Sequence, residues 1–94
     1  MDLTVHDSIA VADDVLFREL DGEAVLLNLQ TGIYFGLNAV ATRMWQLIAD
    51  ERSLARVLDA LRDEYDAEPR VLESDLLDLG RQLCANGLCE IVRS

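Results

Sequence analysis

The spacing of the apolar residues changes once along the chain, at Asn38, and this change divides the fold into two parts. Three short β-prone runs come before it, at residues 15–20, 24–29 and 33–37. Asp21-Gly22 separates the first two runs, and this dipeptide favours a tight hairpin because glycine accepts a positive φ. A second turn, containing Gly32, leads into the third run. The pattern predicts a three-stranded antiparallel β-meander.

Beyond Asn38 the apolar residues recur every three or four positions, which is the period of an amphipathic helix. Asn38 and Ser53 are good N-caps, because their side-chain oxygens accept backbone N–H groups that lack a helical partner. Pro69 suits the first turn of a helix, and Gly87 suits a left-handed C-cap. These signals predict helices over about residues 39–49, 54–65 and 69–85. The flanking runs 9–11 and 88–92 are compatible with short additional strands.

The predicted fold class is therefore α+β and winged helix-turn-helix-like, with a three-stranded antiparallel β-meander followed by three α-helices. A chain of 94 residues has room for a single domain, which we expect to span residues 1–94. Residues 1–14 are weakly patterned, and the sequence leaves open whether they are flexible or ordered.

The charge balance argues against nucleic acid as a partner. The chain has 18 acidic residues and 8 basic ones, all of them arginine, for a net charge of −10. Acidic side chains also dominate the first turns of the third predicted helix, where they would repel phosphates. The apolar runs are too short to span a membrane, and the acidic N-terminal segment is unlike a secretory signal. We therefore expect a cytoplasmic protein without nucleic-acid or membrane partners.

The sequence carries no recognisable catalytic constellation. His6 is the only histidine, so a nucleophile–histidine pair would have to include it. Cys84 and Cys89 stand five apart with no further cysteine or histidine cluster to complete a metal site, and we interpret them as small apolar core residues. We expect no enzymatic activity, no metal and no cofactor.

Two features exceed what core packing requires. The third β-prone run is the last of the meander, so one of its sides lacks a strand partner, yet it has no charge or proline to block pairing. The third predicted helix has apolar residues over a wide arc, with Gly80 inside it. One explanation is a covering strand or a self-paired dimer. The other is an extended peptide that adds a strand at this edge, with its side chains in a groove against the helix.

The run Leu-Asn-Leu-Gln-Thr-Gly-Ile-Tyr-Phe-Gly-Leu-Asn at residues 27–38, followed by Met-Trp-Gln-Leu-Ile at 44–48, resembles PqqD-like proteins. Further matches lie at residues 57–65, at Asp75 before the apolar part of the third helix, and at Gly87-Leu88. The resemblance covers roughly residues 9–92. Two positions depart from the family pattern, Ala41 where glycine is frequent and Gly80 where a large apolar residue is common.

The resemblance implies a recognition element for ribosomally synthesised, post-translationally modified peptides. Such domains bind the leader segment of a precursor as an added strand beside their third strand, in a cleft walled by the third helix, and present it to a modifying enzyme. Carried over to this chain, the peptide-binding residues are Ile33, Tyr34, Phe35, Gly36 and Leu37 on the strand, and Asp75, Leu76, Leu79, Gly80 and Leu83 on the helix.

The stand-alone length resembles the separate recognition subunit of lasso-peptide clusters. The implied partners are a precursor leader peptide and a leader peptidase or other modifying enzyme. Two alternatives stay open. One is PqqD proper, which acts with a radical SAM enzyme in pyrroloquinoline quinone synthesis. The other is a self-pairing structural winged domain without a peptide ligand. The sequence does not decide between a monomer and a dimer.

Overall fold

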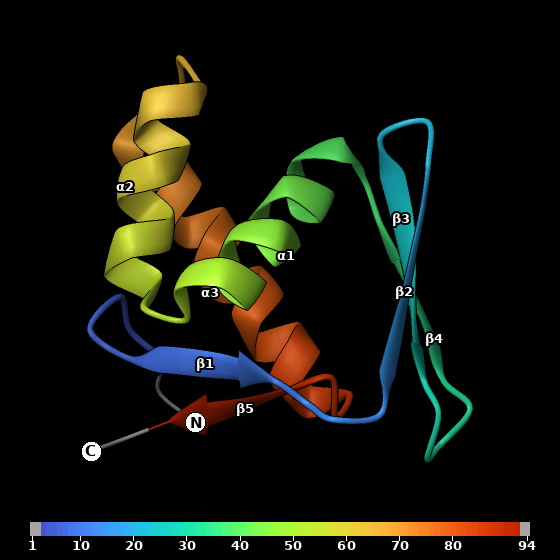
Figure 1. Ribbon diagram of the computed structural model, residues 1–94. Helices are drawn as coiled ribbons and strands as arrows, with labels where there is room; N and C mark the ends of the chain where they lie inside the picture. The colour runs from blue at the N-terminus through green and yellow to red at the C-terminus, as the bar shows by residue number, and fades with distance from the viewer. Residues whose placement is uncertain (1–2, 93–94) are drawn as a thin grey trace.

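The computed structural model describes residues 3–92, and within them the chain forms two antiparallel sheets and three helices. The remaining residues of the expected 1–94 domain lie outside the described part. The elements are β1 (Ser8–Val11), β2 (Val15–Leu20), β3 (Glu23–Asn28), β4 (Tyr34–Leu37), α1 (Ala39–Glu51), α2 (Leu54–Glu64), α3 (Pro69–Ala85) and β5 (Cys89–Val92). The β-meander and the three helices occur in the predicted order, which confirms the α+β fold (Figure 1).

The meander has the strand order β2-β3-β4, so β4 lies at one edge. Asp21 and Gly22 both have positive φ, at 54° and 83°, as the two-residue hairpin between β2 and β3 requires. Side chains alternate between the two faces of the sheet. In β3 the inner side chains Ala24, Leu26 and Asn28 are buried, whereas Val25 on the outer face is exposed. The sheet therefore has one packed face and one open face.

The second sheet joins the two ends of the described chain. β1 pairs antiparallel with β5, with Ile9 opposite Ile91 (Figure 1). Both strands agree with the short runs noted in the sequence, although their mutual pairing was not predicted. Leu3 and Ile9 are buried in the core, so the described part of the weakly patterned segment 1–14 packs against the rest of the domain.

The helices begin at the predicted caps. Asn38 Oδ1 accepts the Ala41 N–H at 2.8 Å, and Ser53 Oγ accepts the Arg56 N–H at 3.4 Å. α1 packs against the inner face of the meander, where the rings of Phe17 and Trp45 stack with centroids 6.5 Å apart. α2 packs against α1 on the side away from the meander, and α3 packs against both α1 and α2 (Figure 1). Within residues 3–92, no helix is long and apolar enough to cross a membrane.

Both cysteines are free thiols in partly or fully buried positions. Burial raises the pKa of Cys89 to about 12 and also raises the pKa of Cys84, because an apolar environment disfavours the thiolate. Protonated thiols of this kind behave as small apolar side chains. This agrees with the interpretation of the two residues as core fillers.

Candidate functional site

The free edge of β4 exposes backbone groups at alternate residues. The Asn28 N–H donates to the Ile33 carbonyl at 3.0 Å, which makes these two residues a hydrogen-bonded pair. Hydrogen-bonded pairs alternate along an antiparallel ladder, so Phe35 opposite Leu26 and Leu37 opposite Ala24 also face β3. The N–H and C=O groups of Tyr34 and Gly36 therefore point away from β3, towards the open edge.

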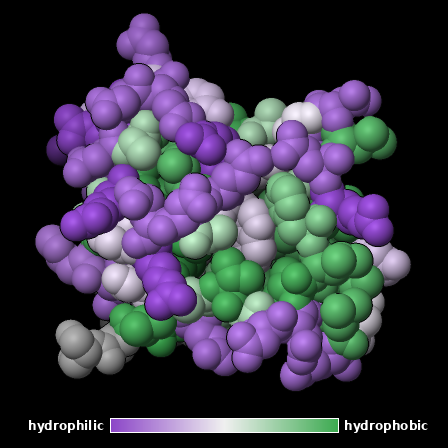
Figure 2. All heavy atoms as spheres, viewed as in Figure 1, coloured by the Kyte–Doolittle hydropathy of each residue, from purple (hydrophilic) through white to green (hydrophobic). Residues whose placement is uncertain are grey.

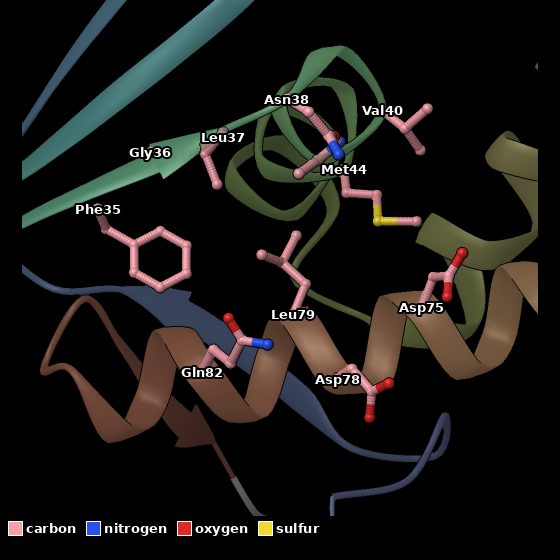
Figure 3. Close-up of a pocket in the computed structure, with 11 residues that line it drawn as sticks. Phe35, Gly36, Leu37, Asn38, Val40, Met44, Asp75, Asp78, Leu79 and Gln82 are labelled. Carbon is pink, nitrogen blue, oxygen red and sulfur yellow. Dashed lines mark hydrogen bonds between the residues drawn. The ribbon is translucent and has the colours of Figure 1, made fainter.

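A groove with apolar and polar walls runs beside this edge, between β4, the first turns of α1 and α3. It encloses about 460 Å³, a size typical of ligand sites. Figure 3 shows Phe35, Leu37, Met44 and Leu79 directed towards one another across it. Met44 and Leu79 are buried and form the floor, whereas Val40 is partly exposed at the rim. Ala41, one of the two departures from the family pattern, also lines the groove.

The rim on the α3 side is polar and acidic. It carries Asp75, Asp78 and Gln82, which project from successive turns of the helix (Figure 3). Asp78 forms an exposed ion pair with Arg81 at 2.8 Å. In the described range, residues 3–92, the Asp75 side chain has no ion pair and no hydrogen bond. A positively charged side chain near this rim would meet a favourable local field. Within residues 3–92, no group of three or more metal-ligating side chains is present.

The structure brings five of the predicted site residues together at the groove: Phe35, Gly36, Leu37, Asp75 and Leu79. Tyr34 lies on β4 with its side chain 71% exposed on the outer face of the sheet. Ile33 immediately precedes β4 and is also exposed. These two residues therefore belong to the strand edge but not to the groove lining.

The other three predicted residues, Leu76, Gly80 and Leu83, do not line this groove. All three are buried in the core, with Leu76 and Leu83 at 0% exposure. They form one stripe of α3, and the groove is lined by the neighbouring stripe through Leu79. Their contribution to peptide binding stays a prediction, and the geometry described here rests on the residues that line the groove.

Gly80 lies at a close contact between α3 and the N-terminal segment. A Cβ atom at this position would lie 2.6 Å from Leu3 Cδ2 and 3.7 Å from Ile9 Cδ1. The glycine thus leaves room for the N-terminal segment to pack on α3.

The sequence reasoning missed Val40, Met44, Asp78 and Gln82. Asp78 and Gln82 lie three and seven positions beyond Asp75, so the helical period starting from Asp75 would have found both. Val40 and Met44 lie on one stripe of α1, four residues apart. No sequence signal showed that this stripe reaches the groove.

The meander, the three helices and the groove define a small α+β domain that holds an open strand edge beside its last helix. The chain belongs to the PqqD family, because the family model described as Coenzyme PQQ synthesis protein D (PqqD) matches residues 23–88. This confirms the resemblance seen in the sequence. No curated protein matches the chain closely enough to count as a relative.

Two solved structures are similar to nearly the whole chain. TbiB1 in complex with the TbiA(beta) leader peptide is 38% identical with a TM-score of 0.82, over 90% of this chain and 99% of that one. Lasso peptide synthetase B1 complexed with the leader peptide is 29% identical with a TM-score of 0.77, over 88% of this chain and 98% of that one.

Proposed function

We propose that this protein is a non-catalytic binding module that recognises the leader segment of a ribosomally synthesised precursor peptide. The observation that carries the proposal is the free edge of β4 beside a groove with an apolar floor and an acidic rim. Adding a strand to such an edge is a recurrent way to bind an extended peptide. The similarity to TbiB1 and to lasso peptide synthetase B1, both solved in complex with a leader peptide, supports the same assignment.

The register of the meander fixes which groups the peptide would use. The outward N–H and C=O groups of Tyr34 and Gly36 supply the backbone hydrogen bonds of an added strand. Peptide residues opposite Phe35 and Leu37 then direct their side chains into the groove, because residues opposite each other share a face. A buried apolar side chain contributes about 1.5–3 kcal/mol, more than a single net hydrogen bond of about 0.5–1.5 kcal/mol. The groove therefore sets most of the preference among peptides.

We further propose that the bound leader is delivered to a separate modifying enzyme, of the lasso-type leader peptidase or cyclase class. The site lining offers no nucleophile–histidine pair, and the single histidine, His6, is exposed and outside the groove. A groove lined in this way suits a binding module that works with a separate catalytic partner. Since ribosomal precursors are made in the cytoplasm, the module would act there.

Titration of a leader peptide into isotope-labelled protein tests the proposal. The peptides are the TbiA(beta) leader and the N-terminal segment of a candidate precursor identified in the gene neighbourhood. We expect saturable shifts of backbone amides in β4 and along the Asp75–Leu79–Gln82 stripe of α3. The amides of β1 and β5 serve as an internal control and should move little. Binding without shifts in β4 would contradict the proposal, as would a well-dispersed spectrum that neither peptide changes.

The same titration separates the proposal from self-pairing through β4. A dimer joined edge to edge would occupy the Tyr34 and Gly36 backbone groups, and peptide would have to displace it. Light scattering should therefore report either a monomer throughout or a dimer that dissociates as peptide is added. A tight dimer that does not dissociate when peptide is added would favour the alternative, a self-pairing structural domain without a peptide ligand.

Asp75→Asn is expected to weaken binding of an arginine- or lysine-containing leader by about two- to fivefold at low salt. The effect should shrink as salt rises, because exposed charges are screened. Asp63→Asn, on the exposed face of α2, removes the same charge away from the groove and serves as the matched control. Equal effects of both substitutions would show that only net charge matters.

A further inference from the structure

Neither the backbone conformation nor the packing of the protein requires a glycine at position 36. Gly36 lies inside β4 without the positive φ that would demand glycine, and a Cβ atom there would meet no heavy atom within 4 Å. Glycine weakens a strand interior, and where neither backbone nor packing requires it, it often marks close approach of a ligand or another chain. The question is therefore what approaches Gly36.

An open hollow lies next to Gly36 on the outer face of the meander, opposite the face that packs on α1. It encloses about 570 Å³, and its lining includes Leu20, Val25, Gly36, Arg18 and Glu23. Leu20 and Val25 are 78% and 42% exposed, so the hollow has an apolar centre between two charged side chains. Figure 2 shows hydrophobic side chains over the part of the meander nearer the β3–β4 turn, whereas the hollow lies at the end with the β2–β3 hairpin.

The hollow and the peptide groove meet at the strand edge. Gly36, Leu37 and Asn38 line both of them. Because Gly36 has no side chain, nothing from this residue separates the outer hollow from the edge where the peptide would add. The two sites are thus continuous around β4.

We propose that the outer hollow is a second side-chain subsite for the same leader peptide, an inference that rests on the proposed function. In a strand added to β4, the residue opposite Gly36 points to the outer face, while its two neighbours point into the groove. A large apolar side chain at this position lies over Gly36 and against Val25. Aromatic side chains are known to cover a strand glycine in this way. The leader is then held on both faces of the sheet.

Three substitutions test the subsite by calorimetric titration with the two leader peptides named above. Val25→Ser removes an apolar wall of the hollow and should weaken binding about tenfold. Leu16→Ser is the matched control, since Leu16 lies on the same face with 41% exposure but does not line the hollow, and it should bind as wild type. Gly36→Val places a side chain between the outer hollow and the strand edge. It should also weaken binding about tenfold, without lowering the melting temperature.

An aspartate scan of the peptide supplies the other half of the test. Aspartate at either of the two groove positions should abolish binding, and so should aspartate at the peptide residue between them. With the Gly36→Val protein, aspartate at that middle residue should lower the affinity far less than it does with wild type. The subsite is wrong if all three variants bind as wild type while Tyr34→Pro, which blocks the strand edge, abolishes binding. In that case leader recognition itself still stands. If wild type binds neither peptide, both proposals are wrong.

Discussion

Tyr34→Pro is expected to weaken leader-peptide binding by about 10- to 100-fold while the domain stays folded. The Tyr34 N–H points to the open edge, so proline removes a donor that only the added strand would use. Its ring also occupies the edge, which is how natural sheets block unwanted pairing. Isothermal titration measures the loss, and circular dichroism checks the fold.

Two substitutions make the Tyr34→Pro result specific. Tyr34→Ser removes the exposed ring but keeps the N–H, and it should bind far better than the proline variant. Phe35→Pro places proline one residue on, where the N–H faces Leu26 of β3, and it should destabilise the meander. Wild-type affinity in Tyr34→Pro would contradict strand addition at β4.

Asn28→Ala is expected to lower the free energy of unfolding by about 2–3 kcal/mol. Asn28 is 5% exposed at the end of β3. Its Nδ2 donates to the carbonyls of Asn86 and Gly87 at 3.3 and 3.2 Å, and its Oδ1 accepts the N–H groups of Gln30 and Thr31 at 2.9 and 3.3 Å. One side chain therefore ties the β3–β4 turn to the C-terminal end of α3.

Urea denaturation of Asn28→Ala measures this loss, and in a domain of this size it should appear as a fall in melting temperature of roughly 10–20 °C. Gln30→Ala is the control, because the exposed Gln30 side chain makes one bond, to Asp14 at 2.9 Å, and should cost less than about 0.5 kcal/mol. Comparable losses in the two variants would show that the buried amide does not hold the turn on α3.

The sequence predicted the elements well where a local signal specified them. The Asp21-Gly22 hairpin, the Asn38 and Ser53 caps and Pro69 each act through neighbouring residues, and each appears as expected. The pairing of β1 with β5 joins segments some 80 residues apart, and no local pattern encodes such a partner. Short apolar runs show that a strand can form but not where it will pair.

Only part of the site could be predicted from the sequence, again because contacts between distant segments decide the rest. Its strand side follows from the meander, because the last strand of a meander has an open edge. Its helix side depends on which stripe of α3 faces the core, and apolar residues cover too wide an arc to show this. Leu3 and Ile9 decide the matter by packing against Gly80, which buries the stripe through Leu76 and Leu83. Only Asp75 and Leu79 of the predicted helix residues remain at the groove.

The antiparallel pairing of β1 with β5 has a consequence for protein architecture. Ser8 lies opposite Val92, so the described chain enters and leaves the domain at one place, while the groove is built from β4, α1 and α3 (Figure 1). Domains with adjacent ends tolerate insertion into a host loop, since the host chain need not be stretched. The domain is therefore suited to transplantation: grafted into a surface loop of an unrelated enzyme, it would carry its strand edge with it.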